Sequence, residues 1–245
     1  NQIEMKKPSV EDDAPNQDDF ECSRPTVDPI VAGKHWRAAF PKNCMEMIFP
    51  NDPPSCSFDL LLMLIKRDNP SSAKQLTRDE LREILINEYM NYYTEHPREI
   101  LSILNTQGKN MMIKRVRQGE VTIEDLIMSE EYFATNLDLW LLARRFNIPL
   151  ILYSGTTLRE NGKNLLVANS DGTDEYYFIK SPAPKPNEIP NNYRLLITTD
   201  AVARISMSSL SVELQMRIRD IQDETPLDTF ITKFALTKRQ IHRVK

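Results

Sequence analysis

Cys56 is the residue whose setting in this sequence best suits covalent chemistry. It ends the loop Asn51-Asp-Pro-Pro-Ser-Cys56, and the apolar run that begins at Phe58 predicts a helix directly after it. The dipole and the free backbone N–H groups at the start of a helix stabilise a cysteine thiolate. The same N–H groups can hold the oxyanion of an acyl-transfer intermediate. The loop therefore makes Cys56 a candidate nucleophile. On this feature alone, an inert buried cysteine is the favoured interpretation.

The residues after Cys56 predict a set of helices followed by a sheet. Expected N-terminal caps at Ser57 and Ser129, and a capping box at Thr77–Glu80, accompany apolar residues at helical spacing. Helices are expected at 58–67, from 78, from 97, at 123–128 and at 130–146, and strands at Leu150–Tyr153, Leu165–Ala168, Tyr176–Ile179 and Tyr193–Ile197. Strands at short intervals after several helices predict an α+β fold, in which helices pack against a mixed or mostly antiparallel sheet.

Three parts of the chain differ in composition. Residues 1–29 are rich in acidic residues and proline, which predicts a flexible acidic arm, with a partner-binding peptide as the alternative. Residues 30–200 carry the expected helices and strands and form the predicted core domain. Residues 201–245 carry two apolar stripes at helical spacing. They predict a C-terminal helical extension that covers the sheet, and docking on a partner or on a neighbouring segment is the alternative.

In their order along the chain, these features resemble the ovarian tumour (OTU) family of cysteine proteases. The resemblance runs from Pro50 to Thr198 and includes the loop before Cys56, the Leu81-Arg82 helix with Tyr89, and the helix-to-strand unit Tyr132–Tyr153. It implies a papain-like, OTU-type mixed sheet packed between helices, with ubiquitin or a ubiquitin-like protein as a candidate partner. The composition, rich in Asn, Ile and Lys, is similar to that of such domains in proteins of large DNA viruses.

Two departures from the family pattern predict a degenerate catalytic centre. The family places an aspartate three residues before the nucleophile, whereas Asp52 lies four residues before Cys56, and Pro53 and Pro54 each remove a backbone donor. The position of the family's catalytic histidine is Asn192, and an amide cannot take a proton from a thiol near neutral pH. We therefore expect a non-catalytic binding or structural module. The alternative is an active deubiquitinase-like cysteine protease that uses Cys56 with an unorthodox base.

The other chemistry-bearing residues predict no cofactor and no metal site. His35, His96 and His242 lie far apart and outside the family's order, and the three cysteines form no C-x-x-C pair. No glycine-rich loop of the phosphate-binding kind occurs. The odd number and irregular spacing of the cysteines favour a reducing compartment. We therefore expect an intracellular protein, cytoplasmic or virion-associated.

The charge balance argues against a nucleic-acid partner. The net charge is −4, whereas nucleic-acid-binding proteins are usually basic over their contact face. A nucleic-acid-associated module that uses the basic stretch 109–117 is the third alternative for the function. A solvated surface is the favoured interpretation of this stretch. No apolar run approaches the roughly 20 residues that cross a bilayer, so no membrane contact is expected. Because the first residue is Asn, the chain is expected to be a piece of a larger protein, whose other segments are further candidate partners.

Overall fold

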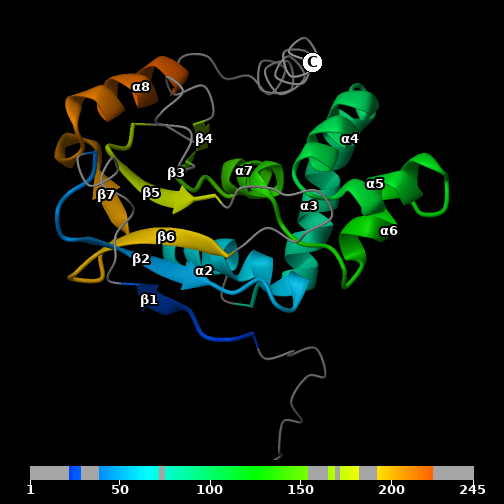
Figure 1. Cartoon of the computed structure of the whole chain (residues 1–245), viewed down its shortest axis with the longest axis horizontal. Helices are drawn as coiled ribbons and strands as arrows, with labels where there is room; N and C mark the ends of the chain where they lie inside the picture. Colours follow the sequence, from blue (N-terminus) through cyan, green and yellow to red (C-terminus); the bar gives the residue numbers. More distant parts are fainter. Residues whose placement is uncertain are drawn as a thin grey trace, which may run out of the picture.

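The computed structural model describes residues 22–28, 39–71, 75–153, 165–168, 172–181 and 192–222. Within these residues, one mixed seven-stranded sheet lies between a large group of helices and the single helix α8 (Figure 1). The helices are η1 (Pro54–Phe58), α2 (Asp59–Asp68), α3 (Arg78–Tyr93), α4 (Pro97–Thr106), α5 (Asn110–Arg117), α6 (Ile123–Met128), α7 (Asn136–Arg145), η2 (Met207–Ser209) and α8 (Val212–Gln222). None of the helices in the described ranges is long and apolar enough to cross a membrane.

The sheet has the order β1-β2-β6-β5-β3-β4, and β7 pairs with β5 beside this path. Only β3 and β5 run parallel, and the other described pairs are antiparallel. The strands are β1 (Thr26–Asp28), β2 (Cys44–Phe49), β3 (Leu150–Tyr153), β4 (Leu166–Ala168), β5 (Glu175–Lys180), β6 (Tyr193–Thr198) and β7 (Arg204–Ser206).

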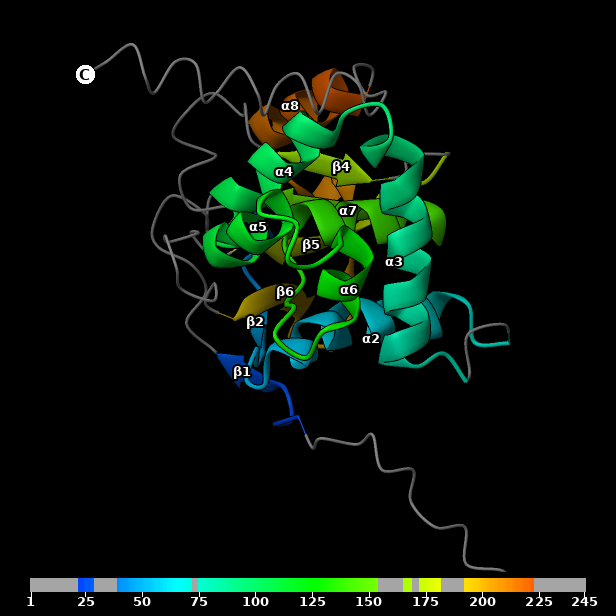
Figure 2. The ribbon, with the colours of Figure 1, turned by 90° about the vertical axis from the view of Figure 1, so that its right-hand side faces the viewer.

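Both faces of the sheet are buried, which explains its continuous apolar runs. On β3, Leu150 and Leu152 belong to the cluster that includes helices α2 to α7, whereas Ile151 and Tyr153 belong to the cluster that includes α8. Successive side chains of a strand point to opposite faces, so one short strand supplies both cores. Figure 2 shows α3, α4, α5 and α6 in front of the sheet, on the same side as α7.

The predicted fold class is confirmed as α+β, with a mixed sheet packed between helices. Strand β3 has the predicted bounds, and β4, β5 and β6 differ from the predicted bounds by one residue at one or both ends. The Thr77–Glu80 capping box is also present, with the Thr77 side chain and the Glu80 side chain each bonded to the other's backbone N–H. Short-range patterns therefore predicted these elements well.

Two local predictions in the helical part are wrong. The helix expected from Glu130 begins at Asn136, because Thr135 forms the capping box with Asp138, and Ser129 instead ends α6. Ser57 does not cap α2, because its hydroxyl accepts a hydrogen bond from the backbone N–H of Ala134.

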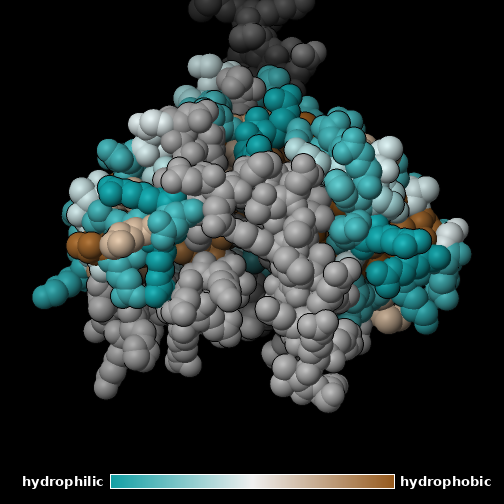
Figure 3. Space-filling model, turned by 90° about the horizontal axis from the view of Figure 1, so that it is seen from above, coloured by the Kyte–Doolittle hydropathy of each residue, from teal (hydrophilic) through white to brown (hydrophobic). Residues whose placement is uncertain are grey.

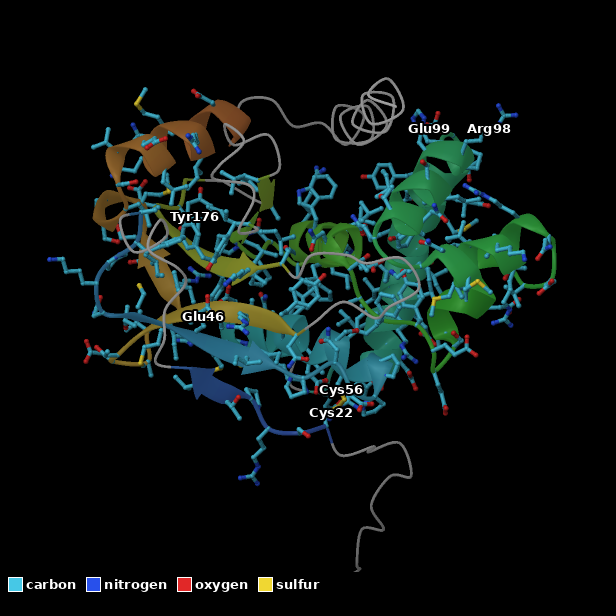
Figure 4. The ribbon with its side chains drawn as sticks, in the orientation of Figure 1. Cys22, Glu46, Cys56, Arg98, Glu99 and Tyr176 are labelled. Carbon is cyan, nitrogen blue, oxygen red and sulfur yellow. A yellow bond between two sulfur atoms is a disulfide. The ribbon has the colours of Figure 1, made fainter. Side chains whose placement is uncertain are left out.

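Strand β2, which lies between β1 and β6 in the sheet, was not predicted. Its side chains include Glu46, which is only 1% exposed and pairs with Lys180 on β5 and Arg194 on β6 at 3.2 and 2.6 Å. Glu46 is labelled in Figure 4, beside these strands. One carboxylate with two cationic partners thus joins three neighbouring strands, and a buried charge of this kind requires such pairing.

The predicted domain boundaries need correction at both ends. Residues 26–28 were assigned to the flexible arm, but they form β1, which pairs with β2. Residues 204–206 were assigned to the helical extension, but they form β7, which pairs with β5. Three-residue strands carry too little periodicity to be recognised without their partners. Residues 1–21 and 29 of the acidic arm, and the second apolar stripe at 227–234, lie outside the described residues.

The first apolar stripe of the C-terminal part packs against this chain, as the favoured interpretation predicted. Leu210, Leu214 and Ile218 are buried in the cluster on the second face of the sheet. Val212 and Met216 lie on the outer side of α8 and are 71% and 59% exposed. Viewed from above, the described surface is mostly hydrophilic, with hydrophobic residues toward its sides (Figure 3).

Lys109 is fully buried and does not belong to a surface basic patch. Its Nζ lies 2.6 Å from Asp138 Oδ2 and 3.2 Å from Thr135 Oγ1, and both charged side chains are 0% exposed. The hydroxyls of Tyr89 and Tyr132 donate to Asp138 Oδ1 at 2.5 and 2.6 Å. Burial lowers the pKa of Lys109, and the nearby Asp138 carboxylate opposes this shift. Burial raises the pKa of both tyrosines, and the Asp138 carboxylate raises it further.

We predict that Trp140→Ala lowers the free energy of unfolding by about 3–5 kcal/mol. Trp140 lies at helical spacing with Leu137 and Leu141, and the structure confirms it as a core residue, 1% exposed, with its indole N–H on the carbonyl of Val167. Urea unfolding measures the change. Met111→Ala is the control, because Met111 is 60% exposed and its loss should cost no more than about 0.5 kcal/mol. Equal costs for the two variants would contradict the placement of Trp140.

We also predict that Lys109→Met destabilises the protein by about 3–5 kcal/mol, because the Asp138 carboxylate then loses its buried counter-charge. Adding Asp138→Asn should recover part of this loss, since it removes the unpaired charge. Lys114→Met on the exposed side of α5 serves as the matched control, with an expected change within about 0.5 kcal/mol. If Lys109→Met were as mild as Lys114→Met in thermal and urea unfolding, the buried ion pair would be excluded.

Candidate functional site

Cys56 lies in the 3₁₀ turn η1, which runs directly into α2, so the predicted position at a helix start is confirmed. Pro53 is extended at the N-cap and Pro54 takes the first turn, where a missing N–H costs no hydrogen bond. The backbone N–H of Cys56 donates to the carbonyl of Pro53 at 2.9 Å. The side chain of Cys56 is only 1% exposed.

Contacts from distant segments hold this turn in place. The hydroxyl of Ser57 accepts from the N–H of Ala134 at 2.6 Å, which connects the turn to the segment before α7. The ring of Phe58 stacks on Tyr132 with 6.2 Å between centroids, and the guanidinium of Arg82 lies 5.6 Å above the Phe58 ring. Cys56 is therefore positioned by rigid, buried neighbours on both sides.

Cys56 is bonded to Cys22 in a disulfide, with 5.8 Å between their Cα atoms, and the two residues are 34 positions apart in sequence. Figure 4 shows Cys22, just before β1, and Cys56, in η1, pointing toward one another. The assumption of reduced cysteines is therefore wrong for this pair. The physical reason is the pairing of β1 with β2, which brings the end of the acidic segment next to the Cys56 turn.

Cys44 is the free cysteine among the described residues, and it offers no alternative nucleophile. It is buried, and burial raises the pKa of its thiol to about 11. The thiol therefore stays protonated near neutral pH, and a protonated buried thiol is a poor nucleophile.

An ion pair lies beside the disulfide. Arg78 donates from Nε to Asp59 Oδ1 at 2.6 Å and from Nη2 to Asp59 Oδ2 at 3.1 Å. The same Nη2 also lies 2.9 Å from Cys22 Sγ. Cys22, Cys56 and Asp59 bring ligand-type atoms within 4.8 Å of one another, but the two sulfurs are bonded together and Arg78 occupies both carboxylate oxygens. In this state the group is a disulfide with an attached ion pair.

The structure places Asn192 against the start of the Cys56 loop. Residue 192 directly precedes β6, and the pairing of Phe49 with Tyr193 aligns it with the end of β2. Its Oδ1 accepts a hydrogen bond from the N–H of Asn51 at 3.2 Å. Asp52, the third predicted site residue, is an exposed neighbour in the same loop. The start of the Cys56 loop and Asn192 therefore meet, and the side-chain amide of Asn192 accepts a hydrogen bond from the backbone there.

Among the described residues, His96 is placed away from this loop. It precedes α4, which Figures 1 and 2 both show at the end of the molecule opposite to α2. His35 and His242 lie outside the described residues.

Few backbone donors remain in the loop to hold an oxyanion. Pro53 and Pro54 have no N–H. The N–H of Asn51 is bonded to Asn192, and that of Cys56 is bonded to Pro53. Four of the six positions from Asn51 to Cys56 are thus without an available donor, whereas an oxyanion hole needs donors aimed at the reacting atom.

Sequence reasoning missed Cys22, Asp59 and Arg78. Cys22 was part of a segment judged flexible, and nothing in its spacing to Cys56 indicates a bond. Asp59 and Arg78 lie 19 residues apart, on the first turns of α2 and α3. No local pattern could have joined the three, because their contact depends on how β1, α2 and α3 come together.

Comparison with known proteins gives limited information about this site. No protein-family model matches the sequence, and no curated protein matches it. A solved structure described as an ovarian tumor (OTU) domain in complex with ubiquitin aligns with a TM-score of 0.40 and 15% sequence identity. The alignment covers 74% of this chain and 87% of that chain. Because the TM-score is below 0.5, we infer neither family nor function from this alignment.

We predict that Cys22→Ser lowers the free energy of unfolding by about 3–4 kcal/mol under oxidising conditions, the entropic contribution of closing a loop of this length. Urea unfolding with and without dithiothreitol measures it. The wild type should lose stability when the reductant is added, and Cys22→Ser should not respond to the reductant. A wild type whose stability is equal in both conditions would show that the bond contributes nothing.

Proposed function

We propose that this chain is an OTU-like domain whose catalytic centre has degenerated, and that it serves as a non-catalytic binding or structural module. The observation that carries the proposal is that the sulfur of Cys56, the residue at the nucleophile position, is bonded to Cys22. A sulfur in a disulfide has no thiolate with which to attack a carbonyl.

Two further observations support the loss of catalysis. The side chain at the histidine position is Asn192, which bonds the backbone of Asn51 and has no basic nitrogen. The N–H of Cys56 is already bonded within its own turn, next to two prolines. The nucleophile, the base and the oxyanion donors are thus all altered, and restoring one of them would leave the other two defects.

The OTU-like assignment itself is supported by the order of the elements and by one long-range contact. The order along the chain is the one on which the resemblance to the OTU family rests: the loop of Cys56, then the helices, then the α7-to-β3 unit. Strand β6 then brings Asn192 to the loop. This contact joins residues 141 positions apart. A match to the OTU pattern at both the Cys56 loop and Asn192 is more specific than a match at the Cys56 loop alone.

Ubiquitin or a ubiquitin-like protein is the first partner to test, with other segments of a larger protein as the second. The nucleic-acid alternative loses support because Lys109 is buried in an ion pair and adds no charge to the stretch 109–117. An intracellular setting, cytoplasmic or virion-associated, remains part of the proposal, as does a large DNA virus as the source. Stable disulfides are rare in a reducing compartment, so such a setting implies that the Cys22–Cys56 bond opens and closes there.

We predict no appreciable hydrolysis of ubiquitin chains by the reduced wild type or by Cys22→Ser, in which Cys56 is free. In the Cys22→Ser background, Asn192→His should increase labelling by a ubiquitin probe with a C-terminal electrophile, because a general base is worth about 10²–10⁴-fold. Asn192→Gln is the matched control, since it changes the same contact without adding a base.

Robust chain cleavage by the reduced wild type, abolished by Cys56→Ala, would contradict the proposal and identify an active cysteine protease. Binding is measured separately by titrating labelled ubiquitin into Cys56→Ala. Saturable binding supports ubiquitin as the partner, and its absence would direct the search to segments of a larger protein.

A further inference from the structure

The two sulfurs of the Cys22–Cys56 bond differ in their access to solvent. The side chain of Cys56, within η1, is 1% exposed, whereas Cys22 is a partly exposed residue in the segment that leads into β1. Thiol–disulfide exchange requires a thiolate to approach one sulfur in line with the bond that breaks, so accessibility decides which sulfur is attacked. In the folded protein, an external thiolate can reach Cys22 and not Cys56.

Cys22 also has a cation beside its sulfur. Arg78 Nη2 lies 2.9 Å from Cys22 Sγ, and the Arg78 side chain is 22% exposed. Asp59 holds this guanidinium in place with two hydrogen bonds. A positive charge at this point attracts an incoming thiolate, and it also stabilises the thiolate that Cys22 becomes when it is released.

We propose that the Cys22–Cys56 pair is a redox-exchange site that an external dithiol reductant opens by attack at Cys22. The first thiolate of the reductant bonds to Cys22 Sγ, the Cys22–Cys56 bond breaks, and Cys56 leaves as a thiolate at the start of η1 and α2. The second thiol of the reductant, as a thiolate, then attacks the reductant's other sulfur, the one bonded to Cys22 in the mixed disulfide. This step releases Cys22 as a thiolate beside Arg78. The reductant becomes a disulfide, and two electrons and two protons pass to the cysteine pair.

Opening the bond has a consequence for the edge of the sheet. Strand β1 has three residues, its described side chains are exposed, and it pairs with the described sheet only through β2. A ladder of this length is marginal without other contacts. The disulfide, four residues before β1, is the covalent link that keeps the strand near β2. Reduction therefore releases β1 and uncovers the backbone edge of β2 from Glu46 to Ile48.

This inference deepens the proposed function, because it concerns the same Cys56 turn and assigns regulation to it. Its test uses no ubiquitin, so its failure and the failure of the proposed function are distinguished by different measurements. A wild type that cleaves ubiquitin chains once reduced would contradict the proposed function and leave the exchange chemistry intact.

The first experiment identifies the attacked sulfur in the folded chain of 245 residues. The oxidised wild type is incubated with glutathione as a monothiol, free thiols are alkylated, and the peptides are analysed by mass spectrometry. We expect glutathione on Cys22 and the alkyl group on Cys56. Glutathione mainly on Cys56, or no reaction without denaturant while the denatured protein reacts fully, would overturn the proposal.

The second experiment tests the role of Arg78 as a positioning residue. The rate of reduction by dithiothreitol should fall by roughly threefold to tenfold in Arg78→Gln, and Arg78→Lys should recover part of the rate because it restores the charge. Arg115→Gln, on the exposed end of α5, is the matched control and should leave the rate unchanged. Equal rates in the wild type and Arg78→Gln would remove Arg78 from the account.

Hydrogen exchange tests the release of β1. Reduction of the wild type should speed amide exchange in residues 26–28 and 46–48, which pair with each other, and β3 should remain protected as an internal control. Reduced and oxidised Cys22→Ser should exchange alike, since this variant has no bond to open. Unchanged protection of 26–28 and 46–48 on reduction of the wild type would contradict the release of the strand.

Discussion

Strand β2 is the element on which the geometry of the site depends. One edge pairs with β6 along all six of its residues, which brings Asn192 to the loop that follows Phe49. The other edge pairs with β1, which brings Cys22 to Cys56. The charge of Glu46 is buried on the same strand and pairs with cations on β5 and β6. A shift of β2 by one residue would turn each of its side chains to the opposite face of the sheet and separate all of these groups.

A second constraint lies in the helical half, at Asp138. Its two carboxylate oxygens accept hydrogen bonds from Lys109, Thr135 and two buried tyrosines, so the charge is fully compensated. These partners come from α3, the start of α5 and the segment before α7. The ring of Tyr132 also stacks on Phe58 in the Cys56 turn, so the polar network supports the turn by direct packing. Helical core and candidate site are therefore coupled through Tyr132.

The features that were predictable from the sequence depend on near neighbours. The run at Leu150–Tyr153 and the box at Thr77–Glu80 are recognisable because a strand buried on both faces and a capped helix each carry a local pattern. Strand β2 was missed because Glu46 suggests an exposed position, and its burial depends on Lys180 and Arg194, more than 130 residues away. Lys109 was assigned to a basic surface for the same reason, since its partner Asp138 is distant in sequence.

In the candidate site too, some features were predictable from the sequence and others depend on distant contacts. Cys56 at a helix start and its association with Asn192 were inferred from order along the chain, and the contact at Asn51 agrees with that order. The bond to Cys22 and the contact with Arg78 were not inferred, because they exist only once β1 is paired and α3 is packed. These two contacts are the basis of the proposal that Cys56, at the nucleophile position, is one member of a redox pair.

The most direct test of this account is a disulfide map of the native protein, alkylated and digested without reduction. We expect the peptides that contain Cys22 and Cys56 to be linked, and Cys44 to react with the alkylating reagent only after unfolding. Unlinked peptides from protein kept under oxidising conditions, with Cys22 and Cys56 each alkylated in the folded state, would contradict it.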